Sequence, residues 1–260
     1  MAASPVSEPK LPPGFRLLRL ESVDSTNAEA KRRAKAGEKG PLWIWSLRQS
    51  AGRGRQGREW QSAPGNLFAS LLLTIEGPLG VASQLSLLAG IAAYDAVAEL
   101  MGDPGKPDGL VLKWPNDVML EHMKLGGILI ESVGAPADNR STVVIGTGLN
   151  LASYPDHIPQ PATSLAAQGI GADPGHALQA LAAHTARWLS RWDEGASFQA
   201  IRRAWLERSA PPGTPLQVKL PQETLEGVFA GLDAGGALRL KTKDGDERRL
   251  TAGDVFFPSA

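Results

Sequence analysis

Apolar residues in the first part of the chain gather in short continuous runs separated by turn residues. Each run is long enough for one strand but too short for a buried helix. The predicted strands cover residues 15–20, 42–47, 67–75, 110–114, 117–120, 127–133 and 142–148. Helical and turn-rich segments lie between the runs, so the pattern indicates a sheet with helices packed against it.

Other segments repeat apolar residues at intervals of three and four, which predicts helices with one buried face. One helix is marked by Leu85, Leu88, Ala92, Ala96 and Leu100, and another by Leu178, Leu181, Thr185, Leu189 and Trp192. A further helical piece extends to about residue 208. A shorter helix is predicted to begin at the capping box Thr26-Asn27-Ala28-Glu29 and to end at Gly37.

The pattern changes at Ala210-Pro211-Pro212-Gly213. Short β runs follow at 216–220, 225–232 and 237–242, and Asp244-Gly245 is a hairpin signal. We therefore expect an α+β domain at 15–209, a small barrel-like all-β domain at 210–260, and a flexible lead-in at 1–14.

Composition narrows the class of protein. The 260 residues include 27 basic and 27 acidic ones, so no overall field favours nucleic acid or an anionic membrane. The absence of cysteine excludes disulfides, thiolate catalysis and cysteine zinc sites. No segment has the ~18 apolar residues of a membrane span, and residues 1–14 do not resemble a signal peptide. We expect a cytoplasmic protein.

A glycine- and arginine-rich segment is the strongest chemical signal. Gly52, Gly54 and Gly57 alternate with Arg53, Arg55 and Arg58, and Trp60 closes the run. Glycine makes such a loop mobile, and guanidinium groups bind phosphate or carboxylate oxygens in bidentate fashion. Taken alone, the segment fits a clamp over an anionic ligand and a solvated basic loop about equally well.

Four further motifs accompany this loop. In chain order they are Ser25-Thr26-Asn27, Lys113-Trp114-Pro115-Asn116-Asp117-Val118, Lys124-Leu125-Gly126-Gly127-Ile128-Leu129-Ile130-Glu131 and Ile145-Gly146-Thr147-Gly148-Leu149-Asn150-Leu151. Together with the loop they resemble the catalytic domain of biotin protein ligases, over about residues 15–260. The resemblance implies a mixed sheet of the class II synthetase-like type, followed by an SH3-like barrel.

The resemblance also implies the reaction. Biotin and ATP, with Mg²⁺, would form biotinyl-5′-adenylate, and biotin would then pass to a lysine of a biotin carboxyl carrier protein of acetyl-CoA carboxylase or a related carboxylase. The implied catalytic residues are Lys124, Arg55 and Asp117. The implied biotin contacts are Ser25, Thr26, Asn27, Gln49, Arg53, Lys124, Gly126, Gly127 and Gly148. The implied nucleotide contacts are Arg53, Arg55, Arg58, Trp60, Asn116, Lys124 and Asn150.

Residue types give these assignments a physical basis. Lys124 and the loop arginines are cations suited to charge on an α-phosphate, and Ser25–Asn27 and Gln49 suit an uncharged ureido ring. Glycines 126, 127 and 148 would leave room for the thiophane ring and tail. Asp117 follows a proline corner and could assist Mg²⁺ or accept the proton of the acceptor lysine.

Several of these residues also have plain structural interpretations. Thr26 could act mainly as a helix cap, and Trp60 as a buried anchor at the end of the loop. Arg58 could be a solvated charge. Asn116 or Asp117 could form an Asx turn, and Asn150 could be a turn residue.

Other functions remain as alternatives. A lipoate–protein ligase would share the chemistry, although the polar cluster favours a ureido ligand. A regulator or adaptor is the non-enzyme alternative, but residues 1–14 are too few for a DNA-binding module, so DNA binding is not expected. The protein is expected to be a monomer or homodimer. Some members of the family it resembles carry a C-terminal arginine near the nucleotide, and Arg248 and Arg249 are the candidates to replace it here. The four histidines show no metal-ligand spacing.

Overall fold

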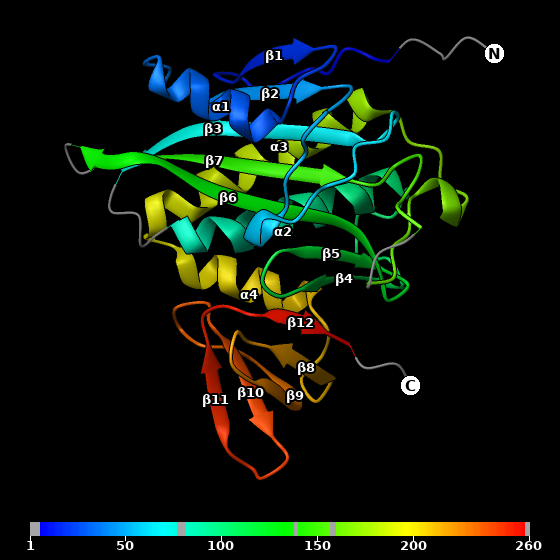
Figure 1. Cartoon of the computed structure of the whole chain (residues 1–260), viewed down its shortest axis with the longest axis vertical. Coiled ribbons are helices and arrows are strands. Elements are labelled where there is room, and N and C mark those ends of the chain that lie inside the picture. The colour runs from blue at the N-terminus through cyan, green and yellow to red at the C-terminus, as the bar shows by residue number, and fades with distance from the viewer. Residues whose placement is uncertain (1–5, 77–81, 138–139, 157–159, 258–260) are drawn as a thin grey trace.

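The computed structural model describes residues 6–76, 82–137, 140–156 and 160–257, and within these ranges the chain forms two sheets. The larger sheet has the strand order β1-β2-β3-β7-β6-β5-β4 (Figure 1). Its strands are β1 Arg16–Leu20, β2 Leu42–Ser46, β3 Leu67–Glu76, β4 Leu110–Lys113, β5 Asp117–Leu120, β6 Met123–Ala137 and β7 Arg140–Leu149. Only the β1–β2 pair is parallel among these neighbours, so the sheet is mixed.

Helices cover both faces of this sheet. Strand β2 is buried on both sides: Trp43 and Trp45 point to a large cluster that includes α2 (Ala82–Leu100), α3 (Pro174–Trp192) and α4 (Phe198–Arg208). Leu42 and Ile44 alternate with the tryptophans and point to a smaller cluster under α1 (Thr26–Lys35). Because α1 is short, it leaves part of its face of the sheet uncovered.

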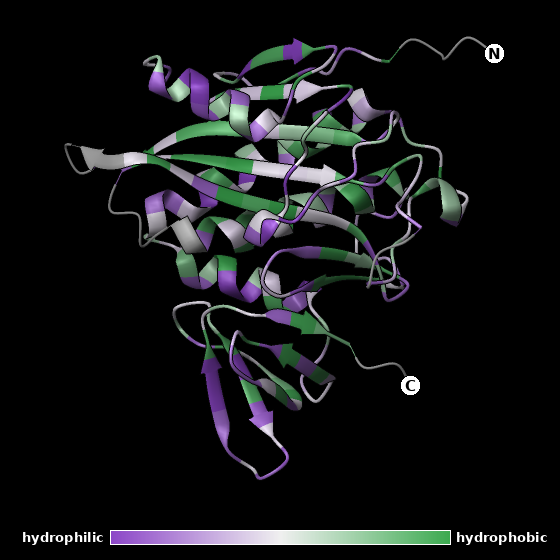
Figure 2. Ribbon diagram, viewed as in Figure 1, coloured by the Kyte–Doolittle hydropathy of each residue, from purple (hydrophilic) through white to green (hydrophobic). Residues whose placement is uncertain are grey.

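The second sheet contains β8 Pro215–Lys219, β9 Thr224–Leu232, β10 Leu238–Thr242, β11 Glu247–Leu250 and β12 Asp254–Phe256. It is antiparallel in the order β11-β10-β9-β8-β12. It packs below α4, where the rings of Trp205 and Phe229 lie 6.4 Å apart edge to face. Figure 2 shows its outer strand β11 as hydrophilic, in contrast to the apolar strands in the middle of the large sheet. The α+β fold class predicted from sequence is confirmed.

Local details differ from the prediction. The N-cap of α1 is Ser25, whose Oγ accepts a hydrogen bond from the Ala28 backbone N–H at 3.5 Å. The capping box expected at Thr26 is therefore wrong, and Thr26 is free for other contacts. Strand β6 begins at Met123 rather than at residue 127, which places Lys124 within the sheet. Strand β12 was not among the predicted strands. No helix in the described ranges is long and apolar enough to cross a membrane.

Candidate active site

A hollow opens on the uncovered part of the α1 face of the large sheet. In β7, Gly146 and Gly148 occupy positions that point to this face, following Val144 in the two-residue alternation. Gly148 pairs with Gly127 of β6, so two neighbouring strands lack side chains at this point. The result is a cavity of about 570 Å³, a size typical of small-molecule sites.

Segments distant in sequence form the walls of this cavity. One wall is the loop 52–60, and another is β12 of the second sheet, which contributes Asp254, Val255 and Phe256. Most residues assigned to biotin or nucleotide also line it. Gly126 is the exception: its missing side chain faces Leu149 and the Gly148 carbonyl, so Gly126 serves packing inside the sheet instead of opening the pocket.

Uncharged polar groups meet at one end of the cavity. The Thr26 backbone N–H and hydroxyl both donate to Gln49 Oε1, at 2.8 and 3.1 Å. The fully buried Ser70 places its hydroxyl 2.7 Å from Thr26 Oγ1 and 2.6 Å from Asn27 Oδ1. The structure thus brings Thr26, Asn27 and Gln49 together. Ser25 lines the cavity beside them, although its hydroxyl also caps α1.

Glu131 fixes the orientation of the Asn27 amide. Asn27 Nδ2 donates to Glu131 Oε2 at 2.9 Å, and Lys31 Nζ lies 2.6 Å from the other carboxylate oxygen. Burial alone would raise the pKa of Glu131, but the hydrogen bonds from Lys31 and Asn27 outweigh it and lower that pKa. The ionised carboxylate therefore directs the Asn27 Oδ1 acceptor toward Ser70.

Three charged side chains meet at the other end of the cavity. The Asp117 carboxylate receives Lys124 Nζ on Oδ1 at 2.7 Å and Lys113 Nζ on Oδ2 at 2.9 Å. The side chains of Asp117 and Lys113 are 10% and 4% exposed, whereas that of Lys124 is 22% exposed. Burial would raise the pKa of Asp117, but Lys124 and Lys113 outweigh it and lower that pKa, so the carboxylate is ionised.

This arrangement does not fit Asp117 as a magnesium ligand. Both of its oxygens bind ammonium groups, which repel a divalent cation. In the described part of the chain no group of three or more His, Cys, Asp or Glu side chains could hold a metal ion. His184 bonds to Glu99, and His157 lies outside the described residues.

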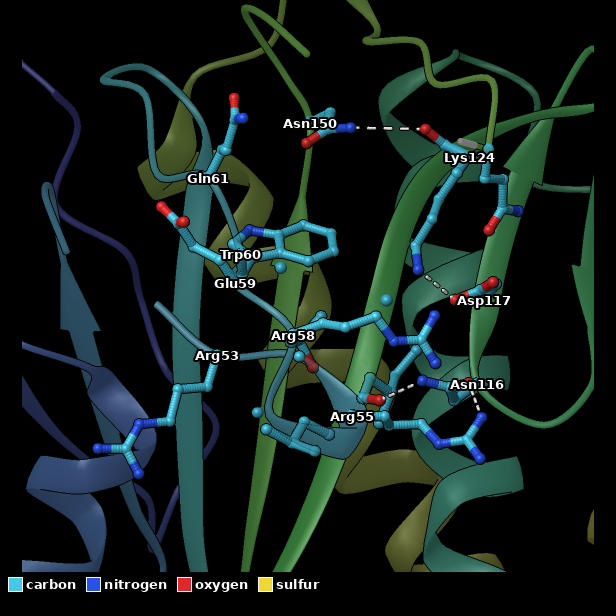
Figure 3. Close-up of a pocket in the computed structure, with 18 of the residues that line it drawn as sticks. Arg53, Arg55, Arg58, Glu59, Trp60, Gln61, Asn116, Asp117, Lys124 and Asn150 are labelled. Atoms are coloured by element: carbon cyan, nitrogen blue, oxygen red, sulfur yellow. Dashed lines mark hydrogen bonds and ion pairs between the residues drawn. The ribbon is translucent and has the colours of Figure 1, made fainter. Parts of the chain in front are cut away.

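The arginine loop contacts both the large sheet and the turn that leads into β12. Figure 3 shows Arg55 beside Asn116. Arg55 Nη1 donates to Asn116 Oδ1 at 3.0 Å, and both of its terminal nitrogens lie 3.5 Å from the Gly253 carbonyl oxygen. Arg58 forms an ion pair with Asp254 at 2.6 Å. Arg53 is exposed, and Figure 3 shows its guanidinium directed away from Lys124.

The side-chain amides of Asn116 and Asn150 donate hydrogen bonds to backbone carbonyls. Asn116 Nδ2 donates to the Ile128 carbonyl at 2.7 Å, and Asn150 Nδ2 donates to the carbonyls of Thr163 at 3.0 Å and Lys124 at 3.4 Å. These contacts favour positioning roles for both amides. Lys124 is thereby anchored through its main chain as well as its side chain.

Trp60 lies over the glycine floor. A Cβ at position 148 would lie 2.6 Å from its indole ring, and one at position 127 would lie 3.4 Å away. Lys124 Nζ is 5.6 Å from the ring centroid. The glycines therefore make room for Trp60, and its buried indole N–H has no hydrogen-bond partner among the described residues.

The two C-terminal arginines lie elsewhere. Arg248 pairs with Glu223, Arg249 pairs with Asp233, and neither lines the cavity. Arg249 does line an adjacent pocket, together with Arg55 and Asn116. The replacement of a C-terminal arginine by Arg249 therefore stays a prediction. Four residues that complete the site were not assigned from sequence: Ser70, Lys113, Glu131 and Asp254. Two of these carried a signal: Lys113 opens the third of the five motifs, and Glu131 closes the fourth.

Comparisons with known proteins agree with this geometry. Residues 20–150 match the biotin/lipoate A/B protein ligase family, and residues 213–257 match the biotin protein ligase C terminal domain. The chain belongs to this family of ligases. It is 38% identical to a biotin–[acetyl-CoA-carboxylase] ligase of Paracoccus denitrificans over 92% of this chain and 99% of that protein.

Further relatives extend the comparison. A biotin–[acetyl-CoA-carboxylase] ligase of Mycobacterium tuberculosis is 34% identical over 91% of this chain and 86% of that protein. Among solved structures, biotin protein ligase from Aquifex aeolicus in complex with biotin and ATP superposes with a TM-score of 0.77 at 25% identity, covering 94% of this chain and 99% of that one. The resemblance drawn from the five motifs is confirmed.

Proposed function

We propose that this protein is an ATP-dependent ligase that activates biotin as biotinyl-5′-adenylate and transfers it to a specific lysine of a biotin carboxyl carrier protein domain. The observation that carries the proposal is the polarity of one continuous cavity. Its Thr26–Asn27–Gln49 end is uncharged, and its Lys124–Asp117 end carries a net positive charge. Biotin matches these two ends, because it has a neutral ureido ring at one end and a carboxylate at the other.

Adenylate formation requires two anions to approach each other. Fixed cations lower the barrier most where water is excluded, because they then need no reorganisation during the reaction. Of the two lysines bound to Asp117, Lys124 has the more exposed side chain, and it lines the cavity. We assign it to the biotin carboxylate and the α-phosphate, with Arg55 and Arg58 holding the nucleotide phosphate. The unpaired indole N–H of Trp60 supports a nucleotide contact for that ring.

Transfer requires the acceptor lysine to lose a proton. We assign this proton to Asp117, the carboxylate whose Oδ1 Lys124 occupies at 2.7 Å. When Lys124 turns to the acyl phosphate, that oxygen becomes available to the incoming amine. The amine then attacks the acyl carbon, the bond to the phosphate oxygen breaks, and AMP leaves.

The remaining assignments are part of the same proposal. The partner is the carrier domain of acetyl-CoA carboxylase or a related carboxylase, residues 15–209 form the catalytic domain, and residues 210–260 form the C-terminal domain. Because Asp117 is engaged by two lysines, we assign no protein ligand to magnesium, which would enter with the phosphates of ATP. A cytoplasmic location remains a prediction.

Pyrophosphate exchange tests the activation step. The protein is incubated with ATP and labelled pyrophosphate, together with biotin, lipoate or neither acid. Exchange that depends on biotin is expected, followed by labelling of a carrier domain but not of its Lys→Ala variant. Exchange with lipoate alone would assign the protein to the lipoate branch of the family, and the absence of exchange with either acid would refute the proposal.

A further inference from the structure

Lys113 is the most buried cation of the cavity, and the proposed reaction gives it no direct contact. It lies on β4 opposite Asp117 of β5 in the antiparallel register. Its Nζ is 2.9 Å from Asp117 Oδ2 and 5.8 Å from the ring centroid of Phe256, which covers it from the second sheet. With its side chain only 4% exposed, Lys113 acts on the site through Asp117.

The charges around Asp117 do not cancel. One carboxylate faces two ammonium groups, so these three side chains carry a net charge of +1 when all are ionised. Asp254 adds a weaker influence on Lys113 from β12. Burial lowers the pKa of Lys113, while the Asp117 carboxylate opposes that change. The Asp117 carboxylate therefore attracts two ammonium groups, that of the buried Lys113 and that of the more exposed Lys124.

We propose that Lys113 is a positioning residue that holds Asp117 by the oxygen opposite Lys124 and so keeps the Lys124 ammonium available to the reacting anions. Without Lys113, the single negative charge of Asp117 would be neutralised by Lys124 alone. A close ion pair shielded from water is costly to separate. Lys124 would then remain on Asp117, and the cavity would lose the positive charge that attracts the biotin carboxylate and the phosphate.

This proposal rests on the proposed ligase activity and predicts an unusual rescue. Lys113→Met should lower kcat/KM for ATP in biotin-dependent pyrophosphate exchange by about tenfold or more. Asp117→Asn, added to Lys113→Met, removes the negative charge that traps Lys124, and should raise exchange at least about threefold above Lys113→Met. Transfer to the carrier should not recover, because the carboxylate is absent in the double variant.

Two further variants separate charge from shape. Lys113→Gln keeps a hydrogen-bond donor without the charge and should be impaired like Lys113→Met, whereas Lys113→Arg should retain more exchange than either. Lys219→Met is the matched control. Lys219 Nζ also lies near the Phe256 ring, 4.9 Å from its centroid, but Lys219 has no ion pair with Asp117, and its loss should leave exchange within about twofold. Thermal unfolding of each variant checks that the fold persists.

The outcomes distinguish this inference from the ligase proposal. If the wild-type protein shows no biotin-dependent exchange, the ligase activity fails. If the wild type exchanges but the double variant is as slow as Lys113→Met or slower, the role of Lys113 is wrong and the activity stands. Wild-type exchange by Lys113→Gln would also overturn it. Should Lys113→Met not fold, Lys113→Gln with and without Asp117→Asn provides the same comparison.

Discussion

Arg58 Nη2 lies 2.6 Å from Asp254 Oδ1, an ion pair between residues 196 positions apart in the chain. It joins the arginine loop to the first residue of β12, and the neighbouring Arg55 contacts the Gly253 carbonyl in the same turn. The Arg58 side chain is 55% exposed, so the pair is weak and readily exchanged. A phosphate entering the cavity can therefore take the place of Asp254.

Loop order should depend on ligand and on Asp254. We expect residues 53–60 to be mobile in the free protein and ordered with bound adenylate, since the glycines make fixing the loop costly, at about 1–2 kcal/mol per residue. Asp254→Ala should increase amide hydrogen exchange of the free loop and change it little when a non-hydrolysable biotinyl-adenylate analogue is bound. Equal protection of the wild-type loop with and without analogue would show a preformed lid.

Lys124→Ala should nearly abolish pyrophosphate exchange, by about a hundredfold or more. The variant loses the cation at the point where the two substrate anions meet, while Asp117 keeps Lys113 as its partner. Circular dichroism and thermal unfolding should confirm the native fold. A loss of less than a few-fold in exchange would remove Lys124 from the reaction.

Arg55→Gly should still form adenylate but retain it poorly. The substitution removes the hydrogen bond to Asn116 and the contacts with the Gly253 carbonyl, which attach the loop to its neighbours. Escaped anhydride would then label lysines of added albumin, measured by streptavidin blotting. Arg248→Gly is the control, because Arg248 pairs with Glu223 away from the cavity. Equal albumin labelling by the two variants would contradict this role.

The sequence predicted the elements well because strand runs and helical periodicity are local. It also placed Lys124 and Asp117 in one site, through motifs that resemble a known family. Ser70 could not be assigned, because its role depends on the β3–β7 register that places it beside Asn27. Asp254 was missed for a similar reason: its contact with the loop comes from packing between two sheets.

Gly146→Ala should weaken biotin binding without unfolding the protein. A Cβ at this position would overlap the Asn27 side-chain amide, which must shift away from Ser70. We expect the Kd for biotin to rise by about tenfold, measured by calorimetry, because the displaced amide oxygen loses the hydrogen bond that Ser70 donates. Gly171→Ala is the control, since nothing lies within 4 Å of a Cβ there. Unchanged affinity in Gly146→Ala would show that Asn27 does not face biotin.

Glu131→Gln should also weaken biotin binding, by about threefold to tenfold, because the neutral side chain no longer fixes the Asn27 amide through a charged acceptor. The lowered pKa of Glu131 sets the pH dependence of the wild type. The carboxylate is ionised above its ordinary value of about 4.3 and loses its charge only as the pH falls through the lower folded value. Glu131 thus stays ionised from pH 8 to about 5, and its titration should not change the affinity for biotin over this range.

Calorimetric titrations across this range test both statements. Glu76→Gln is a suitable control, because Glu76 forms an exposed pair with Arg140 at the end of the sheet. If Glu131→Gln binds biotin as tightly as the wild type and the control, the Asn27 amide is held by Ser70 and the backbone alone. In that case Lys31 and Glu131 would be a surface pair with no influence on the ligand.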